Sequence, residues 1–161
     1  MTLHADAGEG AAREEIRELI RRACWQLDQG DFAAWLSNFD DEGRYEIVAY
    51  SPEIRREMRW LNTSREGLKQ LLKEMPNHVT EDARRAHMVM EIGIEMKEGG
   101  EASALSRFVV FKTNQRGETA VYAVGRYEDL LSGGVGSWRF RARRVLLETR
   151  MFDVFPHIIP L

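Results

Sequence analysis

Apolar side chains recur at helical spacing near the start of the chain and form one continuous face, while arginine and glutamate occupy the opposite face. The apolar face consists of Ile16, Leu19, Ile20, Cys24 and Leu27. This pattern predicts an amphipathic helix that begins near Ala11 and stops at Gly30. Residues 1–10 lack the period, and we expect them to form a mobile tail.

A second, shorter helix is expected directly after the first. Asp31 can cap its N-terminus, and apolar residues recur at helical spacing through residues 32–39. An acidic turn at residues 40–43 follows. The alternation of residues 44–50 then predicts a first strand, which Pro52 ends.

A third helix is predicted by a capping signal. Thr63 and Glu66 have the spacing of a capping box, so a helix is expected to follow and to run to about Glu74. Residues 75–82 form the loop after it. The segment 52–62 before it is rich in arginine and glutamate and matches no pattern, so its contacts are open.

The second half of the chain changes to a period of two, which is typical of strands. One long strand is predicted to carry a strongly apolar face made of Met88, Met90, Ile92, Ile94 and Met96. Residues 102–113 are apolar on both faces near Phe108, so they should lie centrally in the sheet. Glycines separate three further strand candidates at hairpin-like intervals, which favours antiparallel pairing.

The last predicted strand carries an irregularity. Apolar residues hold the even positions from Trp138 to Ala142, but the odd positions at Val145 and Leu147. An extra residue near Arg143, a β-bulge, would correct the phase and bend the sheet. We therefore expect an α+β fold, a curved antiparallel sheet wrapped around N-terminal helices in a cone, forming a single domain over residues 11–161.

Composition narrows the class of protein. The chain has 161 residues, 43% of them hydrophobic and 30% charged, as in an ordinary globular domain. It shows no apolar run long enough to span a membrane and no signal-peptide pattern, so a cytoplasmic location is expected. The single cysteine, Cys24, lies on the apolar helix face, so we interpret it as a small buried hydrophobic residue. A net charge of −3 makes nucleic acid an unexpected partner.

Known metal and cofactor signatures are missing. A Rieske cluster needs two cysteines and two histidines, and this chain has one cysteine. The four histidines, His4, His78, His87 and His157, are scattered along the sequence without ligand spacing. We expect no catalytic, cofactor-binding or metal-binding residues in this chain.

Weak acid–base candidates exist where the cavity of a cone would lie. Asp40, Tyr45, His87 and Glu91 could converge there, and an acid–base pair in an apolar cup can isomerise or dehydrate a small carbonyl compound. Ordinary structural roles for all four side chains are the simpler interpretation, and we favour it.

The densest basic stretch lies in the last strand, at Arg139, Arg141, Arg143 and Arg144. Alternate arginines on a strand share one face, which could bind an anion or nucleic acid, pair with acidic residues on an outer face, or meet another protein. The 26 acidic residues of the chain favour the salt-bridged outer face.

The C-terminal segment 151–161 is unusually apolar for a terminus and contains two prolines. So many apolar groups must pack on something. Packing on the core of the same chain and contact with another subunit are equally compatible with the sequence.

The second half of the chain resembles the small (β) subunits of Rieske-type aromatic-ring-hydroxylating dioxygenases. The similarity rests on residues 83–87 entering a long strand, on Gly125, Arg126 and Asp129 within residues 124–131, and on the arginine-rich residues 138–148. The first half fits more loosely, and the resemblance covers about residues 12–161.

This resemblance implies a SnoaL-like, nuclear-transport-factor-like cone and a hexamer of three large and three small subunits. It implies that the large subunit holds the Rieske cluster and the non-heme iron, supplied with electrons from NAD(P)H. The small subunit would bring no cofactor or catalytic group, and would assemble and stabilise the large subunits while meeting other copies of itself around a three-fold axis.

Two alternatives stay open. The chain could be a stand-alone SnoaL-like isomerase or dehydratase that uses His87 with an aspartate or tyrosine. It could also be a module that binds a hydrophobic ligand inside the cone. The aromatic substrate and the interface residues cannot be read from this sequence.

Overall fold

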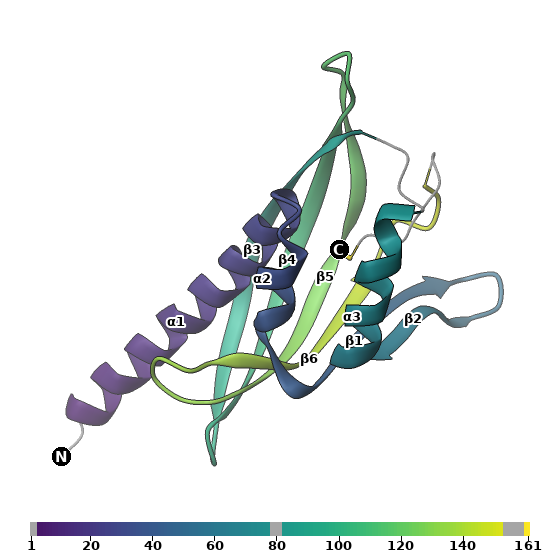
Figure 1. The fold of residues 1–161 in the computed structure, drawn as a ribbon. Coiled ribbons are helices and arrows are strands. Elements are labelled where there is room, and N and C mark those ends of the chain that lie inside the picture. Colours follow the sequence, from purple (N-terminus) through teal and green to yellow (C-terminus); the bar gives the residue numbers. More distant parts are fainter. Residues whose placement is uncertain (1–2, 78–81, 153–159) are drawn as a thin grey trace.

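The computed structural model describes residues 3–77, 82–152 and 160–161, with side chains from Gly8 onward. One layer is a curved six-stranded sheet, and helices cover one of its faces (Figure 1). The helices are α1 (Leu3–Asp28), α2 (Phe32–Ser37) and α3 (Arg65–Glu74), followed by a short 3-10 turn, η1 (Met75–Asn77). The expected α+β fold with N-terminal helices is confirmed.

Six strands form the sheet in the order β2-β1-β6-β5-β4-β3. They are β1 (Phe39–Ser51), β2 (Arg56–Ser64), β3 (Arg84–Lys97), β4 (Glu101–Thr113), β5 (Thr119–Ser132) and β6 (Arg139–Leu147). Hairpins join β3, β4, β5 and β6 in sequence, as the glycine spacing predicts. The sheet is not wholly antiparallel, however, because β1 pairs with β6 in parallel. Most of the charged segment that matched no pattern belongs to β2.

Two helix boundaries differ from the sequence-based expectation. The helix α1 begins at Leu3 rather than near Ala11, so it includes residues 3–10, for which a tail was expected. At α3 the cap is Ser64 rather than Thr63, since the Ser64 hydroxyl accepts a hydrogen bond of 3.2 Å from the Gly67 amide. Asp31 caps α2 as expected, with its carboxylate 3.1 Å from the Ala34 amide nitrogen.

The bulge predicted in the last strand is present. Leu131 pairs with Phe140 and Leu130 with Ala142, so Arg141 is the extra residue on β6, just ahead of the expected position. The bulge turns Arg143 toward the helices and leaves Arg141 exposed. It also increases the local bend of the sheet, as bulges generally do.

The core lies between the helices and the sheet. The whole predicted apolar face of α1 is buried there, and it meets a cluster of aromatic rings from α2, β1 and β6. In that cluster the Trp35 ring lies 5.0 Å from Phe39 and 5.5 Å from Tyr45, in edge-to-face contacts. Such pairs add to the free energy gained by burying the rings.

The helix α1 also protects the free edge of the sheet. Its Arg13 donates to the Ile94 carbonyl, its Arg17 pairs with Glu91, and its Asp28 accepts from the His87 amide at 2.9 Å. Unpaired backbone groups on an edge strand invite pairing with other chains. Arg13 and Asp28 of α1 bind two such backbone groups on β3.

Candidate functional site

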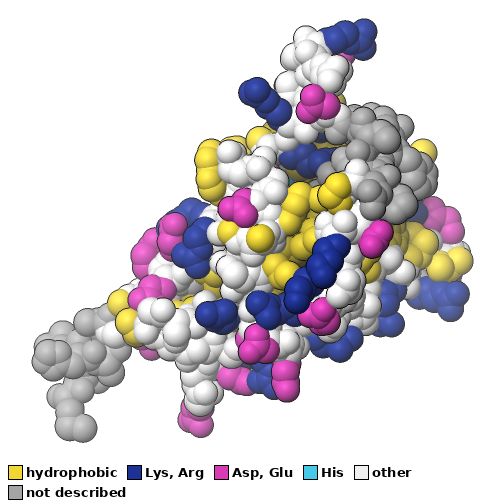
Figure 2. Space-filling model, viewed as in Figure 1, with side chains coloured by type: hydrophobic (Ala, Val, Ile, Leu, Met, Phe, Trp, Pro, Cys, Tyr) yellow, Lys and Arg dark blue, Asp and Glu magenta, His cyan; other side chains and the backbone are white. Residues whose placement is uncertain are grey.

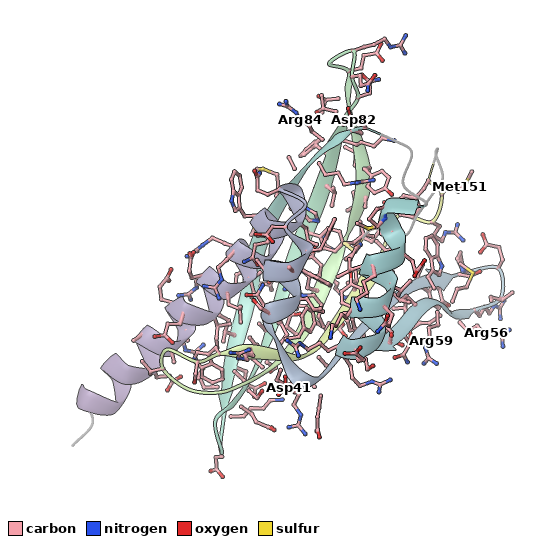
Figure 3. The ribbon with its side chains drawn as sticks, in the orientation of Figure 1. Asp41, Arg56, Arg59, Asp82, Arg84 and Met151 are labelled. Atoms are coloured by element: carbon pink, nitrogen blue, oxygen red, sulfur yellow. The ribbon has the colours of Figure 1, made fainter. Side chains whose placement is uncertain are left out.

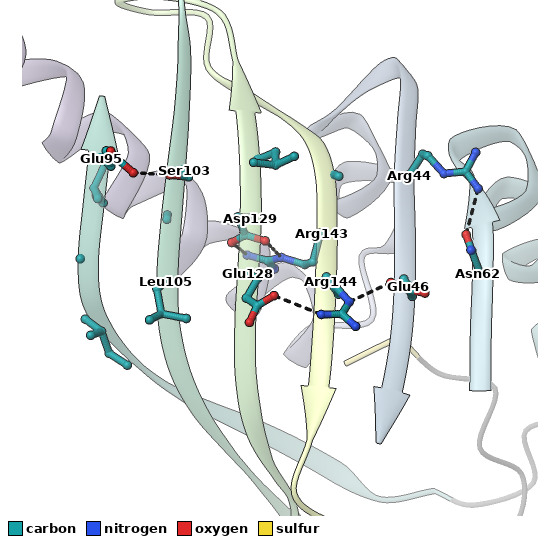
Figure 4. Close-up of a pocket in the computed structure, with 16 residues that line it drawn as sticks. Arg44, Glu46, Asn62, Glu95, Ser103, Leu105, Glu128, Asp129, Arg143 and Arg144 are labelled. Carbon is teal, nitrogen blue, oxygen red and sulfur yellow. Dashed lines mark hydrogen bonds and ion pairs between the residues drawn. The ribbon is translucent and has the colours of Figure 1, made fainter. Parts of the chain in front are cut away.

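A groove of about 750 Å³ runs across the face of the sheet turned away from the helices (Figure 4). We call it the sheet-face groove. Its apolar floor includes Ile92 of β3, Leu105 of β4 and Leu130 of β5. Successive side chains of a strand point to opposite faces of the sheet. Asp129, the neighbour of Leu130, is buried on the helix side, so Leu130 points outward. Ile92 and Leu105 lie on the same outer face.

Arg144 is the centre of the charged side of this groove. Its guanidinium lies 3.0 Å from a Glu46 oxygen and 3.3 Å from a Glu128 oxygen (Figure 4). It also pairs with Glu57. Partial burial alone would lower the pKa of Arg144, but the hydrogen bonds of Glu57 and Glu46 raise it. Glu46 also pairs with Arg59 and Glu128 with Arg126, so the charges of this cluster balance, which suits contact with another protein better than capture of an anion.

An exposed apolar stripe on β3 borders the sheet-face groove. Met88 is 65% exposed, Met90 63% and Ile92 50%. These residues form the apolar face that the sequence predicts for this strand, but a register shift between Glu91 and Gly93 divides that face. After the shift, Ile94 lies on the buried side of the strand. Met88, Met90 and Ile92, which precede Ile94, lie on the exposed side.

The basic run of β6 does not form one face, which corrects the sequence-based interpretation. Arg143 is fully buried, and its guanidinium makes two hydrogen bonds of 2.8 Å to the Asp129 carboxylate. It also stacks 4.2 Å from the Tyr127 ring centre. Burial alone would lower the pKa of Arg143, but the Asp129 carboxylate outweighs this and raises it, so the arginine stays charged. The other arginines of the run lie toward the surface.

Two of the residues behind the family resemblance, Gly125 and Asp129, have structural roles. Asp129 is the partner of Arg143, and Gly125 lies where a Cβ atom would come within 2.5 Å of the Leu146 carbonyl oxygen. These positions join β5 to β6 at close range. They support the sheet rather than a reaction centre.

The four acid–base candidates do not converge. Asp40 accepts a hydrogen bond of 2.9 Å from Ser132, and the Tyr45 hydroxyl donates to the Leu161 carbonyl at 2.7 Å. Glu91 pairs with Arg17 at the edge of the sheet. Burial raises the pKa of Tyr45, so its hydroxyl stays protonated and serves as a structural donor.

His87 has a partner that the sequence did not indicate. Its Nδ1 lies 2.6 Å from an Asp28 oxygen at the end of α1, and both side chains are buried. Asp28 and His87 are far apart in sequence, so no motif could have joined them. The same carboxylate binds the His87 backbone amide, so the pair fixes α1 to β3.

Within the described residues, no group of three or more His, Cys, Asp or Glu side chains could hold a metal ion. The side chains of His4, His78 and His157 lie outside the described part. No helix in the described part is long and apolar enough to cross a membrane. Cys24 is buried, and desolvation raises the pKa of its thiol to about 11, which leaves it protonated and unreactive at neutral pH.

The apolar C-terminal segment packs partly on its own domain. Leu161 is buried, and its amide donates to the Tyr45 hydroxyl at 2.9 Å. The Phe152 ring lies 5.0 Å from Tyr122. Met151, in contrast, is 90% exposed beyond the end of β6 (Figure 3). Residues 153–159 lie outside the described part, so a contact of these residues with another subunit stays a prediction.

Comparison with known proteins identifies the family. The model of the SnoaL-like domain matches residues 9–144. The chain is 32% identical over 155 residues to the methanesulfonate monooxygenase hydroxylase subunit beta of Methylosulfonomonas methylovora, covering 91% of this chain and 86% of the relative. It is 28% identical to the 2-aminobenzenesulfonate 2,3-dioxygenase subunit beta of an Alcaligenes species, covering 89% and 95%.

The fold has solved counterparts. The β subunit of a protein assigned as an aromatic-ring-hydroxylating dioxygenase from Novosphingobium aromaticivorans superposes with a TM-score of 0.76 at 21% identity, covering 91% of this chain and 94% of that one. The chain therefore belongs to the SnoaL-like domain family and, within it, to the small (β) subunits of oxygenases of the ring-hydroxylating type.

Proposed function

We propose that this chain holds the catalytic large subunits of an oxygenase together and makes that contact through the sheet-face groove and the methionine stripe of β3. The large subunit supplies the Rieske cluster and the non-heme iron. The small subunit supplies rigid surface and no catalytic group. Three copies of each chain form the oligomer, and neighbouring small subunits meet around its three-fold axis.

The observation that supports this proposal is the composition of the helix-free face. An exposed apolar stripe lies beside a groove whose central charges are already paired, as in Arg144 with Glu46 and Glu128. Contiguous exposed apolar surface is uncommon in chains that stay monomeric and is typical of interfaces. Because these charges are already paired within the subunit, covering them with a specific partner costs little free energy of desolvation.

The relatives indicate which substrates to assay. Their names refer to methanesulfonate, 2-aminobenzenesulfonate and, for the small subunit from Burkholderia cepacia, anthranilate. Each compound carries a sulfonate or carboxylate group. We propose that the assembled enzyme hydroxylates a small organic acid, with an aromatic acid as the first choice, and that the large subunit selects it.

Substitutions in the sheet-face groove test the interface. We expect Leu130→Asp combined with Ile92→Asp to abolish co-purification with the large subunit, because two unpaired carboxylates would be buried at the contact. Both residues are half exposed, so the isolated variant should remain folded by circular dichroism. The measurement is the amount of large subunit recovered on a tagged small subunit.

Val135→Asp is the matched control, since Val135 is an exposed apolar residue in the loop before β6. Recovery of the large subunit with this variant should equal that of the wild type. Full recovery with the folded double variant would contradict the assignment of the interface.

A further inference from the structure

A second groove lies between α2 and α3, on the helix side of the molecule. Its volume is about 400 Å³, and its apolar floor includes Phe32 and Leu36 of α2 and Leu72 of α3. Figure 2 shows hydrophobic side chains at the surface between these helices, with Lys and Arg side chains along the border. We call it the α2–α3 groove.

The cations of this groove form a single row. Arg65, Lys69 and Lys73 line it and are spaced four residues apart on α3. At 1.5 Å rise per residue the row is about 12 Å long. On α2, Phe32 and Leu36 have the same spacing, so an apolar row and a cationic row run along the two walls.

The positive charge of the row is only partly neutralised. Arg65 pairs with Asp41 at 2.9 Å, and Lys69 approaches Glu66 at 3.5 Å. Among the residues that the structure describes, Lys73 forms no ion pair, and its charge acts on Glu66 only at longer range. The groove therefore differs from the sheet-face groove, where the central arginine is saturated by glutamates.

These dimensions favour a peptide segment over a small anion. A single carboxylate or sulfonate group would engage one or two cations, whereas the row extends over two helical turns beside a parallel apolar wall. An amphipathic segment with acidic residues on one side and apolar residues on the other matches both rows at once.

We infer that the α2–α3 groove binds an acidic amphipathic segment of the large subunit. This inference rests on the proposed function and adds a second contact, on the side of the chain opposite to the sheet-face groove. The apolar residues of the segment fill the floor, and its carboxylates pair with Lys69 and Lys73.

Charge reversal tests the inference in the complete complex. Lys69→Glu with Lys73→Glu should weaken capture of the large subunit about tenfold or more, the effect of losing at least one good contact. Lys97→Glu with Arg116→Glu makes the same change of charge on two hairpin turns and should bind like the wild type. Both double variants change exposed residues, and circular dichroism checks their folding.

Amine labelling of the wild-type complex provides an independent readout. Lys69 and Lys73 should be protected from an amine-reactive reagent in the complex and labelled in the isolated chain, while Lys97 should be labelled in both. Protection of Lys69 and Lys73 in the isolated chain would overturn the inference. Loss of that protection on dilution would indicate a second copy of the chain in the groove, and loss on stripping small molecules would indicate a bound organic acid.

The outcomes separate the two proposals. Failure of the wild-type chain to capture any large subunit would overturn both. Capture by the wild type with equal capture by the Lys69→Glu, Lys73→Glu variant, and no protection of these lysines, would overturn the α2–α3 contact alone.

Discussion

The most consequential single residue is Arg143, a charged side chain that is fully buried between the helices and the sheet. Its guanidinium donates two hydrogen bonds to the Asp129 carboxylate and lies over the rings of Tyr127 and Phe140. A buried ion pair of this kind adds little net stability compared with apolar residues of the same size, but losing one partner leaves an uncompensated charge. Its value lies in fixing how β5 and β6 pair.

We predict that Asp129→Ala lowers the free energy of unfolding by about 3–5 kcal/mol, because Arg143 would stay buried without a counter-ion. Urea unfolding followed by circular dichroism measures the loss. Glu148→Ala is the control, since Glu148 pairs with Arg107 at the surface and should contribute less than about 1 kcal/mol. Equal small losses in both variants would show that Arg143 finds water or another partner.

Individual site residues were only partly predictable from the sequence. The helical period indicated that Cys24 would be buried, because this residue lies on a regular apolar face. The burial of Arg143 was not predicted, since it depends on whether the bulge falls before or after this residue. The partner of His87 was not predictable either, because contact between Asp28 and His87 arises only when α1 lies along β3.

Among the elements, α1 has a role beyond filling the core. Its Arg13, Arg17 and Asp28 meet the edge strand β3 at three levels along its length. An edge strand covered in this way is less available for pairing with other chains. The outward face of the same strand keeps its methionines exposed, so contact with a partner is directed to the face of the sheet rather than to its edge.

We predict that Asp28→Ala loosens the start of β3. The substitution removes the acceptor of both the His87 amide and the His87 ring, and buried donors left without a partner cost about 1–3 kcal/mol each. Hydrogen–deuterium exchange should therefore become faster at His87 and its neighbours in β3. Glu18→Ala, on the exposed face of α1, should leave this exchange unchanged.

Exchange in β3 that stayed as slow as in the wild type after Asp28→Ala would show that the hydrogen bonds of Asp28 to His87 do not stabilise the edge strand.

Elements with a clear hydrophobic period were predictable, and those without one were not. The three helices and the strands of the second half follow from local patterns. The strand β2 was missed because it is an edge strand with few buried residues, so charged side chains such as Arg56 and Arg59 are tolerated on it (Figure 3). The parallel pairing of β1 with β6 joins distant segments and leaves no local trace in the sequence.

At the scale of the whole molecule, two different surfaces lie on opposite sides of one domain. The sheet-face groove has an apolar floor beside the paired charges around Arg144, and the α2–α3 groove has an apolar floor beside cations that are incompletely paired. A chain with two such surfaces can contact two neighbours in an oligomer at the same time. This arrangement suits a subunit that organises larger chains.

Native mass spectrometry after co-expression with the large subunit tests the central claim most directly. We predict one dominant species that contains both chains in equal number, with three copies of each, and loss of that species when the small subunit is omitted. Large subunits that assemble and hydroxylate their substrate equally well without this chain would contradict the account.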